Sequence, residues 1–148
     1  MPPILIDTNV LVYTFDQDEL SKQEQAIRVL KQLELPGSGR LSVQCLAEFV
    51  SVSTRRLRPP LTPAEAVVQV ERFAQAYTVF DLTPTVVLEA ARGVRDHQLS
   101  YYDAQLWATA RLNQVPVIFS EDFGSRTSLE GVWFVNPFAD AFVLEAWA

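Results

Sequence analysis

Short apolar runs alternate along the chain with longer segments in which apolar residues recur every three or four positions. The short runs have the length of buried strands and lie at 3–6, 40–43, 78–80, 116–119 and 132–135. The longer segments have helical spacing and lie at 7–13, 20–35, 44–55, 63–77, 84–98 and 100–112. Strands that alternate with helices predict an α/β/α sandwich around a mainly parallel sheet.

No internal repeat, low-complexity tract or long linker divides the sequence, so we expect one domain over residues 1–148. Hydrophobic residues make up 49% of the chain and charged residues 20%, as in ordinary globular domains. The apolar runs are too short to cross a bilayer, and no signal peptide opens the chain. Cys45 has no second cysteine with which to form an internal disulfide. We therefore expect a cytoplasmic protein without membrane contacts.

Three acidic residues stand where a parallel sheet would bring them together. Asp7 and Asp122 each follow an apolar strand, and the carboxyl ends of parallel strands share one edge of a sheet. Asp103 lies in the first turn of a predicted helix, where the helix dipole favours a negative charge. Ser100 precedes Asp103 by three positions, as in a capping box. We expect these carboxylates to meet in one crevice.

Glu48 lies between Ala47 and Phe49 in a predicted helix that is apolar on most sides. We expect this helix to be deeply packed, with the Glu48 carboxylate inside it. Burying an ionised carboxylate costs on the order of several kcal/mol unless a cation or hydrogen-bond donors compensate it. A metal ion would provide such compensation.

Carboxylate oxygens are the ligands that Mg²⁺ prefers, and four acids have the capacity for one ion or two. Two ions can stabilise the attacking and departing oxygens of a phosphodiester without a protein nucleophile. A zinc or thiol mechanism is disfavoured, because His97 has no evident zinc partners and Cys45 has no adjacent histidine. The net charge of −6 argues against nonspecific nucleic-acid binding, although bound metal would add positive charge.

Each acid also has a purely structural explanation. Asp7 and Asp103 can support helix starts, and Asp122 can begin a turn. These explanations are favoured for each residue alone, and Glu48 reverses the balance when the four acids are taken together. Polar side chains stand beside two of these acids, Asp7 and Asp122. They are Thr8, Asn9 and Ser120, and they either orient the acids or only cap helices.

Arg55, Arg56 and Arg58 form a local basic cluster in this acidic chain. A solvated helix end is the more common reading of such a cluster, and a substrate path is the alternative.

Four segments together resemble the motif pattern of PIN domains, especially that of VapC-like toxins from bacterial toxin–antitoxin pairs. They are Asp7-Thr8-Asn9, Gln44-x-x-x-Glu48-Phe49, Tyr102-Asp103-Ala104 and Ser120-Glu121-Asp122. The pattern covers essentially the whole chain in order. The resemblance implies an α/β/α sandwich and an endoribonuclease that depends on Mg²⁺ or Mn²⁺.

The resemblance also implies roles for single residues. The catalytic and metal-binding acids would be Asp7, Glu48, Asp103 and Asp122, with Thr8, Asn9 and Ser120 as supporting groups. Two adjacent acids are available in the last motif. Asp122 is preferred for its two-residue offset from Ser120, and Glu121 is kept as a reserve ligand.

The resemblance further implies a homodimer and a protein antitoxin whose tail covers the acidic groove with a basic side chain. Neither partner follows from composition. The RNA substrate and its cleavage site stay open, since transfer, ribosomal and messenger RNA all offer single-stranded loops.

Two other classes of function remain alternatives. Asp7 after a strand could be the nucleophile of an aspartate-dependent phosphatase, but position 9 is Asn where that family has a second acid. The acids could also form a non-enzymatic module that binds a basic partner peptide. Assays of the purified protein with RNA, with and without Mg²⁺, would distinguish these classes.

Overall fold

The computed structural model describes residues 2–147 and is built on a six-stranded sheet. The strands are β1 (Ile4–Ile6), β2 (Gly39–Ser42), β3 (Thr78–Phe80), β4 (Val117–Phe119), β5 (Ser128–Leu129) and β6 (Val132–Val135). They lie in the order β3-β2-β1-β4-β6-β5, and all neighbours are parallel except β5 and β6. The predicted mainly parallel sheet is confirmed, with β1 and β4 at its centre.

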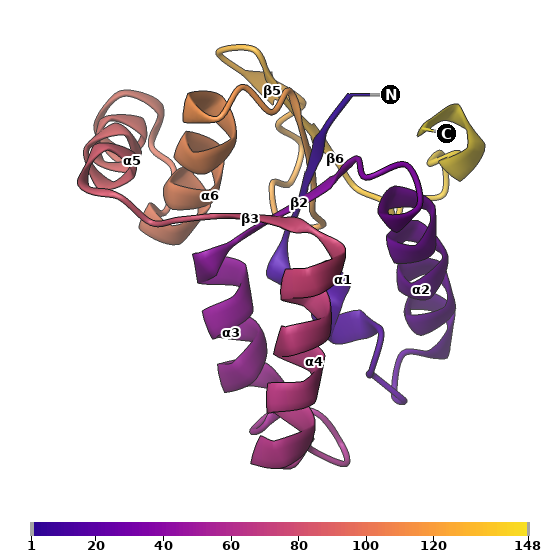
Figure 1. The fold of residues 1–148 in the computed structure, drawn as a ribbon. Helices are drawn as coiled ribbons and strands as arrows, with labels where there is room; N and C mark the ends of the chain where they lie inside the picture. Colours follow the sequence, from indigo (N-terminus) through magenta and orange to yellow (C-terminus); the bar gives the residue numbers. More distant parts are fainter. Residues whose placement is uncertain (1, 148) are drawn as a thin grey trace.

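Helices cover both faces of the sheet. They are α1 (Thr8–Tyr13), α2 (Leu20–Glu34), α3 (Val43–Ser53), α4 (Pro63–Ala76), α5 (Pro84–His97) and α6 (Tyr101–Leu112), with a short 3₁₀ helix, η1, at Leu144–Trp147. In Figure 1, α1 to α4 lie on one side of the sheet, and α5 and α6 lie on the other. The α/β/α sandwich predicted from the sequence is therefore confirmed.

Polar side chains at the helix starts explain why several elements begin where they do. Ser42 ends β2 and caps α3, since its hydroxyl accepts a hydrogen bond from the backbone N–H of Cys45. Thr62 and Glu65 form a reciprocal capping box at α4. The capping box expected at Ser100 is not formed, because the Ser100 side chain accepts no hydrogen bond from the backbone of α6. Ser100 is still the residue that precedes α6.

The core lies where the central strands meet the helices. All three residues of β1 and all three of β4 are buried. On the other face, Trp107 of α6 is buried against α5, where Gly93 leaves room for its ring. A Cβ at Gly93 would lie 2.8 Å from Trp107 Cζ3, so the close contact of the two helices requires glycine there.

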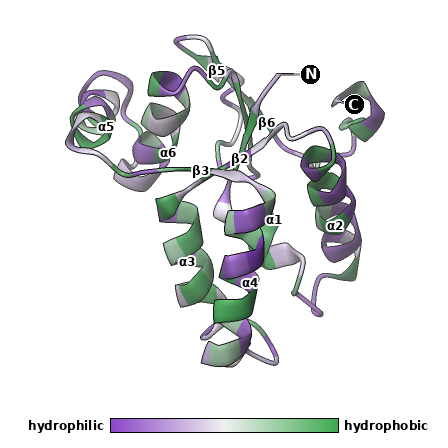
Figure 2. Ribbon diagram, in the orientation of Figure 1, coloured by the Kyte–Doolittle hydropathy of each residue, from purple (hydrophilic) through white to green (hydrophobic). Residues whose placement is uncertain are grey.

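Figure 2 shows α3 as largely hydrophobic and α2 as largely hydrophilic. Only one side of α3 is buried, however, through Cys45, Phe49 and Ser53. The expectation that α3 is deeply packed is therefore wrong, because its other side faces away from the sheet. None of the helices in residues 2–147 is long and apolar enough to cross a membrane.

Candidate active site

Asp7 lies at the carboxyl end of β1, in the middle of the sheet. Its backbone N–H donates to the carbonyl of Phe119 at 3.0 Å, which ties the ends of β1 and β4 together. The side chain is only 7% exposed. It accepts two short hydrogen bonds, from Ser120 Oγ to Oδ2 at 2.6 Å and from the Thr8 backbone N–H to Oδ1 at 2.7 Å.

Burial is the main electrostatic influence on Asp7, and it raises the pKa of this carboxyl from 3.8 to about 7. The hydrogen bonds from Ser120 and Thr8 oppose this shift, whereas the negative charges of Asp122 and Glu48 add to it. The ionised form is therefore disfavoured without a nearby positive charge. A cation bound beside Asp7 would reverse this preference.

Asn9 links Asp7 to Asp122. Its amide nitrogen lies 3.0 Å from Asp122 Oδ2 and 3.4 Å from both Asp7 Oδ2 and Ser120 Oγ. The backbone N–H of Asp122 also donates to Ser120 Oγ at 3.0 Å. Asn9 Oδ1 is inaccessible to solvent and has no hydrogen-bond partner among residues 2–147. The Asn9 amide and the Ser120 hydroxyl thus both lie within hydrogen-bond distance of Asp7.

Glu48 reaches the same place from α3. Thr8 Oγ1 donates to Glu48 Oε2 at 3.1 Å, and Gln44 Nε2 donates to Oε1 at 2.8 Å. The Glu48 side chain is half-buried, so the sequence argument for a fully buried charge at this position was wrong. Asp7 is the acid to which that argument applies.

Gln105 is a residue that the sequence analysis missed. It is buried on α6 and donates through Nε2 to Gln44 Oε1 at 2.9 Å. Gln44 also donates to the backbone carbonyl of Tyr102 at 3.2 Å. These bonds connect Glu48 on α3 to the first turns of α6. The sequence signal was an uncharged polar residue between the apolar Ala104 and Leu106 of this helix.

Asp103 enters from the start of α6. Its side chain is half-buried, and its pKa is raised mainly by this burial, against a lowering by Ser100. The charges of Asp122 and Glu48 raise the pKa further, so Asp103 is electrostatically part of the same cluster. We call Asp7, Glu48, Asp103 and Asp122 the acid cluster.

Glu121 is held apart from the acid cluster. Its carboxylate accepts hydrogen bonds from the Tyr13 hydroxyl and, at 3.0 Å, from Lys22 Nζ. The charge of Glu121 is thus balanced by a lysine, and the neighbouring Asp122 is the residue that contacts Asn9. This arrangement supports the choice of Asp122 over Glu121.

A cavity of about 330 Å³ opens over three of the four acids, and we call it the acid cavity. Its lining is Asp7, Thr8, Asn9, Val12, Tyr13, Asp16, Glu48, Val52, Arg56 and Asp122. Asp103 is absent from this lining. Among residues 2–147, no three His, Cys, Asp or Glu side chains are arranged closely enough to hold a metal ion in this conformation.

The residues nevertheless suit a hard divalent cation. Their donor atoms are carboxylate oxygens. Among residues 2–147, the buried Asp7 carboxylate has no cationic partner, and Asn9 Oδ1 is a buried oxygen without a hydrogen-bond partner. Side chains would have to move to bring the four acids around an ion, Asp103 among them, because it lies outside the cavity lining.

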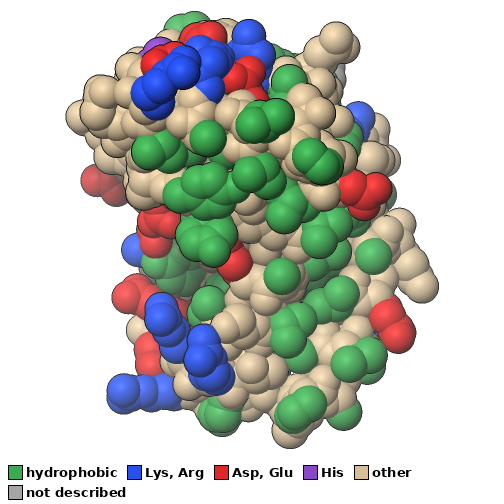
Figure 3. All heavy atoms as spheres, turned by 90° about the vertical axis from the view of Figure 1, so that its left-hand side faces the viewer, with side chains coloured by type: hydrophobic (Ala, Val, Ile, Leu, Met, Phe, Trp, Pro, Cys, Tyr) green, Lys and Arg blue, Asp and Glu red, His purple; other side chains and the backbone are tan. Residues whose placement is uncertain are grey.

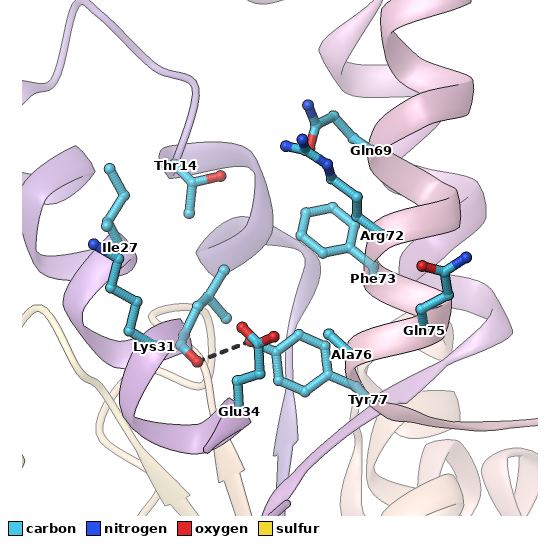
Figure 4. Close-up of a pocket in the computed structure, with 11 residues that line it drawn as sticks. Thr14, Ile27, Lys31, Glu34, Gln69, Arg72, Phe73, Gln75, Ala76 and Tyr77 are labelled. Carbon is cyan, nitrogen blue, oxygen red and sulfur yellow. Dashed lines mark hydrogen bonds between the residues drawn. The ribbon is translucent and has the colours of Figure 1, made fainter.

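A separate hollow of about 500 Å³ lies between α2 and α4 (Figure 4). Phe73 and Tyr77 form its apolar wall, and the Tyr77 hydroxyl donates to the carbonyl of Leu30 at 2.8 Å. Its lining shares no residue with the acid cavity. The two hollows are therefore separate.

A parallel-sheet domain with acids clustered beyond its central strands belongs to the class of α/β proteins with a site at the carboxyl edge. The sequence of residues 4–125 matches the PIN domain family, and the chain is a member of that family. No curated protein sequence matches the chain significantly.

Solved structures share this fold at low sequence identity. VapC20 of Mycobacterium tuberculosis, described as a sarcin-ricin loop cleaving toxin, is 20% identical with a TM-score of 0.64, over 81% of this chain and 92% of that one. A DNA-bound VapBC from Salmonella typhimurium is 17% identical with a TM-score of 0.64, over 93% and 99%. A toxin–antitoxin complex from Klebsiella pneumoniae is 16% identical with a TM-score of 0.65, over 90% and 97%. The chain thus has the fold of VapC toxins.

Proposed function

We propose that residues 1–148 form a metal-dependent endoribonuclease that acts as the toxin of a toxin–antitoxin pair. The observation that carries this proposal is the buried Asp7 carboxylate, which shares one polar network with Asp122 and a second with Glu48. Membership of the PIN family and the VapC-like fold support it.

Asp7, Glu48, Asp103 and Asp122 would hold Mg²⁺, with Mn²⁺ as a substitute. Such an ion supplies positive charge for the phosphate oxygens and lowers the pKa of a bound water. Whether one ion or two bind is left to titration, which gives the stoichiometry directly.

The surrounding side chains position these acids. Ser120 holds Oδ2 of Asp7, and Thr8 contributes both a backbone donor to Asp7 and a hydroxyl donor to Glu48. Asn9 donates to Asp122, which keeps two like-charged carboxylates beside each other. These contacts orient Asp7, Glu48 and Asp122 before substrate binds, which lowers the reorganisation that catalysis would need at these three acids.

Cleavage of RNA by the purified protein tests the proposal. Asp7→Asn and Asp103→Asn should each nearly abolish Mg²⁺-dependent cleavage, because each removes a ligand charge with little change in volume. Asp81→Asn, at an exposed position, is the matched control and should cleave normally. Equal cleavage by all four proteins at matched Mg²⁺ would remove Asp7 and Asp103 from the site.

The same preparations separate the alternative functions. Hydrolysis of small phosphomonoesters without RNA cleavage would favour the phosphatase. Binding of basic peptides without any hydrolysis would favour the acidic interaction module.

For the partner, we propose an antitoxin that places Arg or Lys against the acid cluster. Two of the similar structures are described as toxin–antitoxin or VapBC complexes. Clustered carboxylates attract a guanidinium, which can bridge two of them through paired hydrogen bonds. Inhibition by a co-purified neighbouring gene product should weaken at high Mn²⁺ and when its basic residue becomes alanine. Inhibition that was unchanged both at high Mn²⁺ and after the alanine substitution would contradict this arrangement.

We also propose a homodimer, supported by an apolar face. Figure 3 shows hydrophobic side chains spread across the middle of one face. A hollow of about 590 Å³, lined by Val43, Ala47, Leu82 and Tyr102 among others, opens beside Glu48. Sedimentation should show a dimer that Leu82→Glu dissociates. Leu35→Glu, at a 91% exposed apolar position outside this hollow, should not.

A further inference from the structure

Arg56 is the one cationic side chain in the lining of the acid cavity. It follows α3 in a turn, and its backbone N–H donates to the carbonyl of Val52 at 2.8 Å. The next residue, Leu57, is buried with 5% exposure and anchors this turn. The backbone that carries the guanidinium is therefore fixed, although the side chain itself is exposed.

Within residues 2–147, the Arg56 side chain has no hydrogen bond and no carboxylate within 4.0 Å, even though its cavity contains four acidic residues. Its neighbour Arg55 differs. The Arg55 guanidinium donates hydrogen bonds to two acceptors of Ser51, the backbone carbonyl at 3.2 Å and Oγ at 2.7 Å. Arg55 is therefore tied to its own helix, whereas Arg56 is available to a ligand.

The charge of the cavity indicates what that ligand is. Once a divalent cation neutralises part of the acid cluster, the uncommitted guanidinium at the cavity wall is left to attract an anion. Arginine matches the geometry of a carboxylate or a phosphate through two parallel N–H···O bonds, and the carboxylates that line this cavity leave Arg56 unpaired, so a phosphate is the anion that we consider. Figure 3 shows Lys and Arg side chains close to Asp and Glu side chains at the lower left of that face.

We propose that Arg56 binds a backbone phosphate of the RNA and so positions the strand over the acid cluster, without itself holding metal. This inference rests on the proposed ribonuclease function and assigns Arg56 to the substrate path. Arg55, in contrast, belongs to the solvated helix end.

The test measures RNA binding apart from cleavage. A labelled single-stranded oligoribonucleotide is titrated with Asp103→Asn protein in Mg²⁺, alone and combined with Arg56→Ala, Arg56→Lys or Arg55→Ala. Asp103 lies outside the lining of the acid cavity, so the wall around Arg56 stays intact. Thermal unfolding of each variant shows that it is folded.

Arg56→Ala should weaken RNA binding about tenfold, as the loss of a charge-assisted hydrogen bond does. It should also make the slope of log K against log salt shallower by about 0.7, the value of one phosphate contact on a single strand. Arg56→Lys should restore that slope in large part, because a lysine keeps the charge. Arg55→Ala should bind as the parent does, and Mn²⁺ affinity should be the same with and without Arg56.

The outcomes separate this inference from the function on which it rests. RNA cleavage by the unmodified protein together with equal RNA binding by Arg56→Ala and Arg55→Ala would overturn only the role of Arg56. Loss of Mn²⁺ affinity in Arg56→Ala would show that Arg56 supports the metal site indirectly, because a guanidinium cannot bind the ion itself, and this would also overturn the inference. A protein that neither binds nor cleaves RNA would overturn both proposals.

Discussion

Ser120 and Asp7 are 113 positions apart in the sequence and are joined by a hydrogen bond of 2.6 Å from Ser120 Oγ to Asp7 Oδ2. The bond connects the residues that follow the two central strands. The bond lowers the pKa of Asp7, but burial outweighs it and raises that pKa to about 7. The stability of the metal-free protein should therefore depend on pH.

Asp7→Asn should remove part of that pH dependence. The pKa of Asp7 is 3.8 unfolded and about 7 folded, so the folded state binds more protons between these values. The contribution of Asp7 to stability is thus present below pH 3.8 and is lost as the pH rises to 7. Three pKa units correspond to ~4 kcal/mol at most.

The measurement is urea unfolding of metal-free protein at pH 4, 5.5 and 8, as a range around the two pKa values. Relative to the native protein, Asp7→Asn should gain stability at the highest pH and little at the lowest. Added Mn²⁺ should reduce that advantage, because only the native protein has the charge that the ion needs. A stability difference independent of pH would contradict the raised pKa.

Asp122→Asn should slow RNA cleavage much more than Glu121→Gln, although the two residues are adjacent. Asp122 contacts Asn9 in the acid cavity, whereas Glu121 accepts from Tyr13 and Lys22. We expect cleavage to fall at least a hundredfold in Asp122→Asn, as for removal of a group that orients or binds metal. Glu121→Gln should keep most activity. If the two rate effects were reversed, Glu121 would replace Asp122 as the ligand.

Glu48→Gln should weaken Mn²⁺ binding while leaving the fold intact. Both carboxylate oxygens already accept hydrogen bonds, from Gln44 and Thr8, and an amide keeps the shape of the side chain. Glu48→Lys should be tolerated less well, because it places a cation opposite those two donors. Calorimetric titration gives the affinity, and an unchanged value in Glu48→Gln would rule out ligation by Glu48.

Gly93→Ala should destabilise the protein by about 1–3 kcal/mol, which is typical of overpacking. The added Cβ would meet the Trp107 ring at 2.8 Å, and that ring is wholly buried. Leu88→Ala on the same helix, at a 73% exposed position, is the control and should change stability by less than about 0.5 kcal/mol. Equal thermal midpoints for the two variants would show that α5 and α6 separate easily.

Much of the fold was predictable because apolar residues are spaced differently along strands and helices. The apolar runs ahead of Asp7 and Asp122 became β1 and β4, and the helix expected from Pro84 ends at His97. The two-residue strand Ser128–Leu129 was missed, since a strand so short has no periodicity. It forms only because β6 offers an edge with which to pair.

The sequence predicted that the four acids lie near one another at the carboxyl edge of the sheet, but not which of them is buried. Apolar neighbours in sequence suggested that Glu48 was the buried acid, yet a helix on the outside of a sheet buries one side only. Asp7 is buried because it follows a strand that has neighbours on both edges. Contacts across the fold, such as Gln105 to Gln44, have no counterpart in local sequence.

The position of β4 beside β1 also determines when the site can exist during synthesis. β1 pairs with β4 through partners such as Ile4 and Val117, so its neighbour on that edge is made more than a hundred residues later. Pairing over so long a separation is slow, because the intervening chain must first be ordered. Until β4 is available, Asp7 has neither Ser120 nor Asp122 beside it. A growing chain therefore carries Asp7 through more than a hundred further residues of synthesis without the side chains that it contacts in the folded protein.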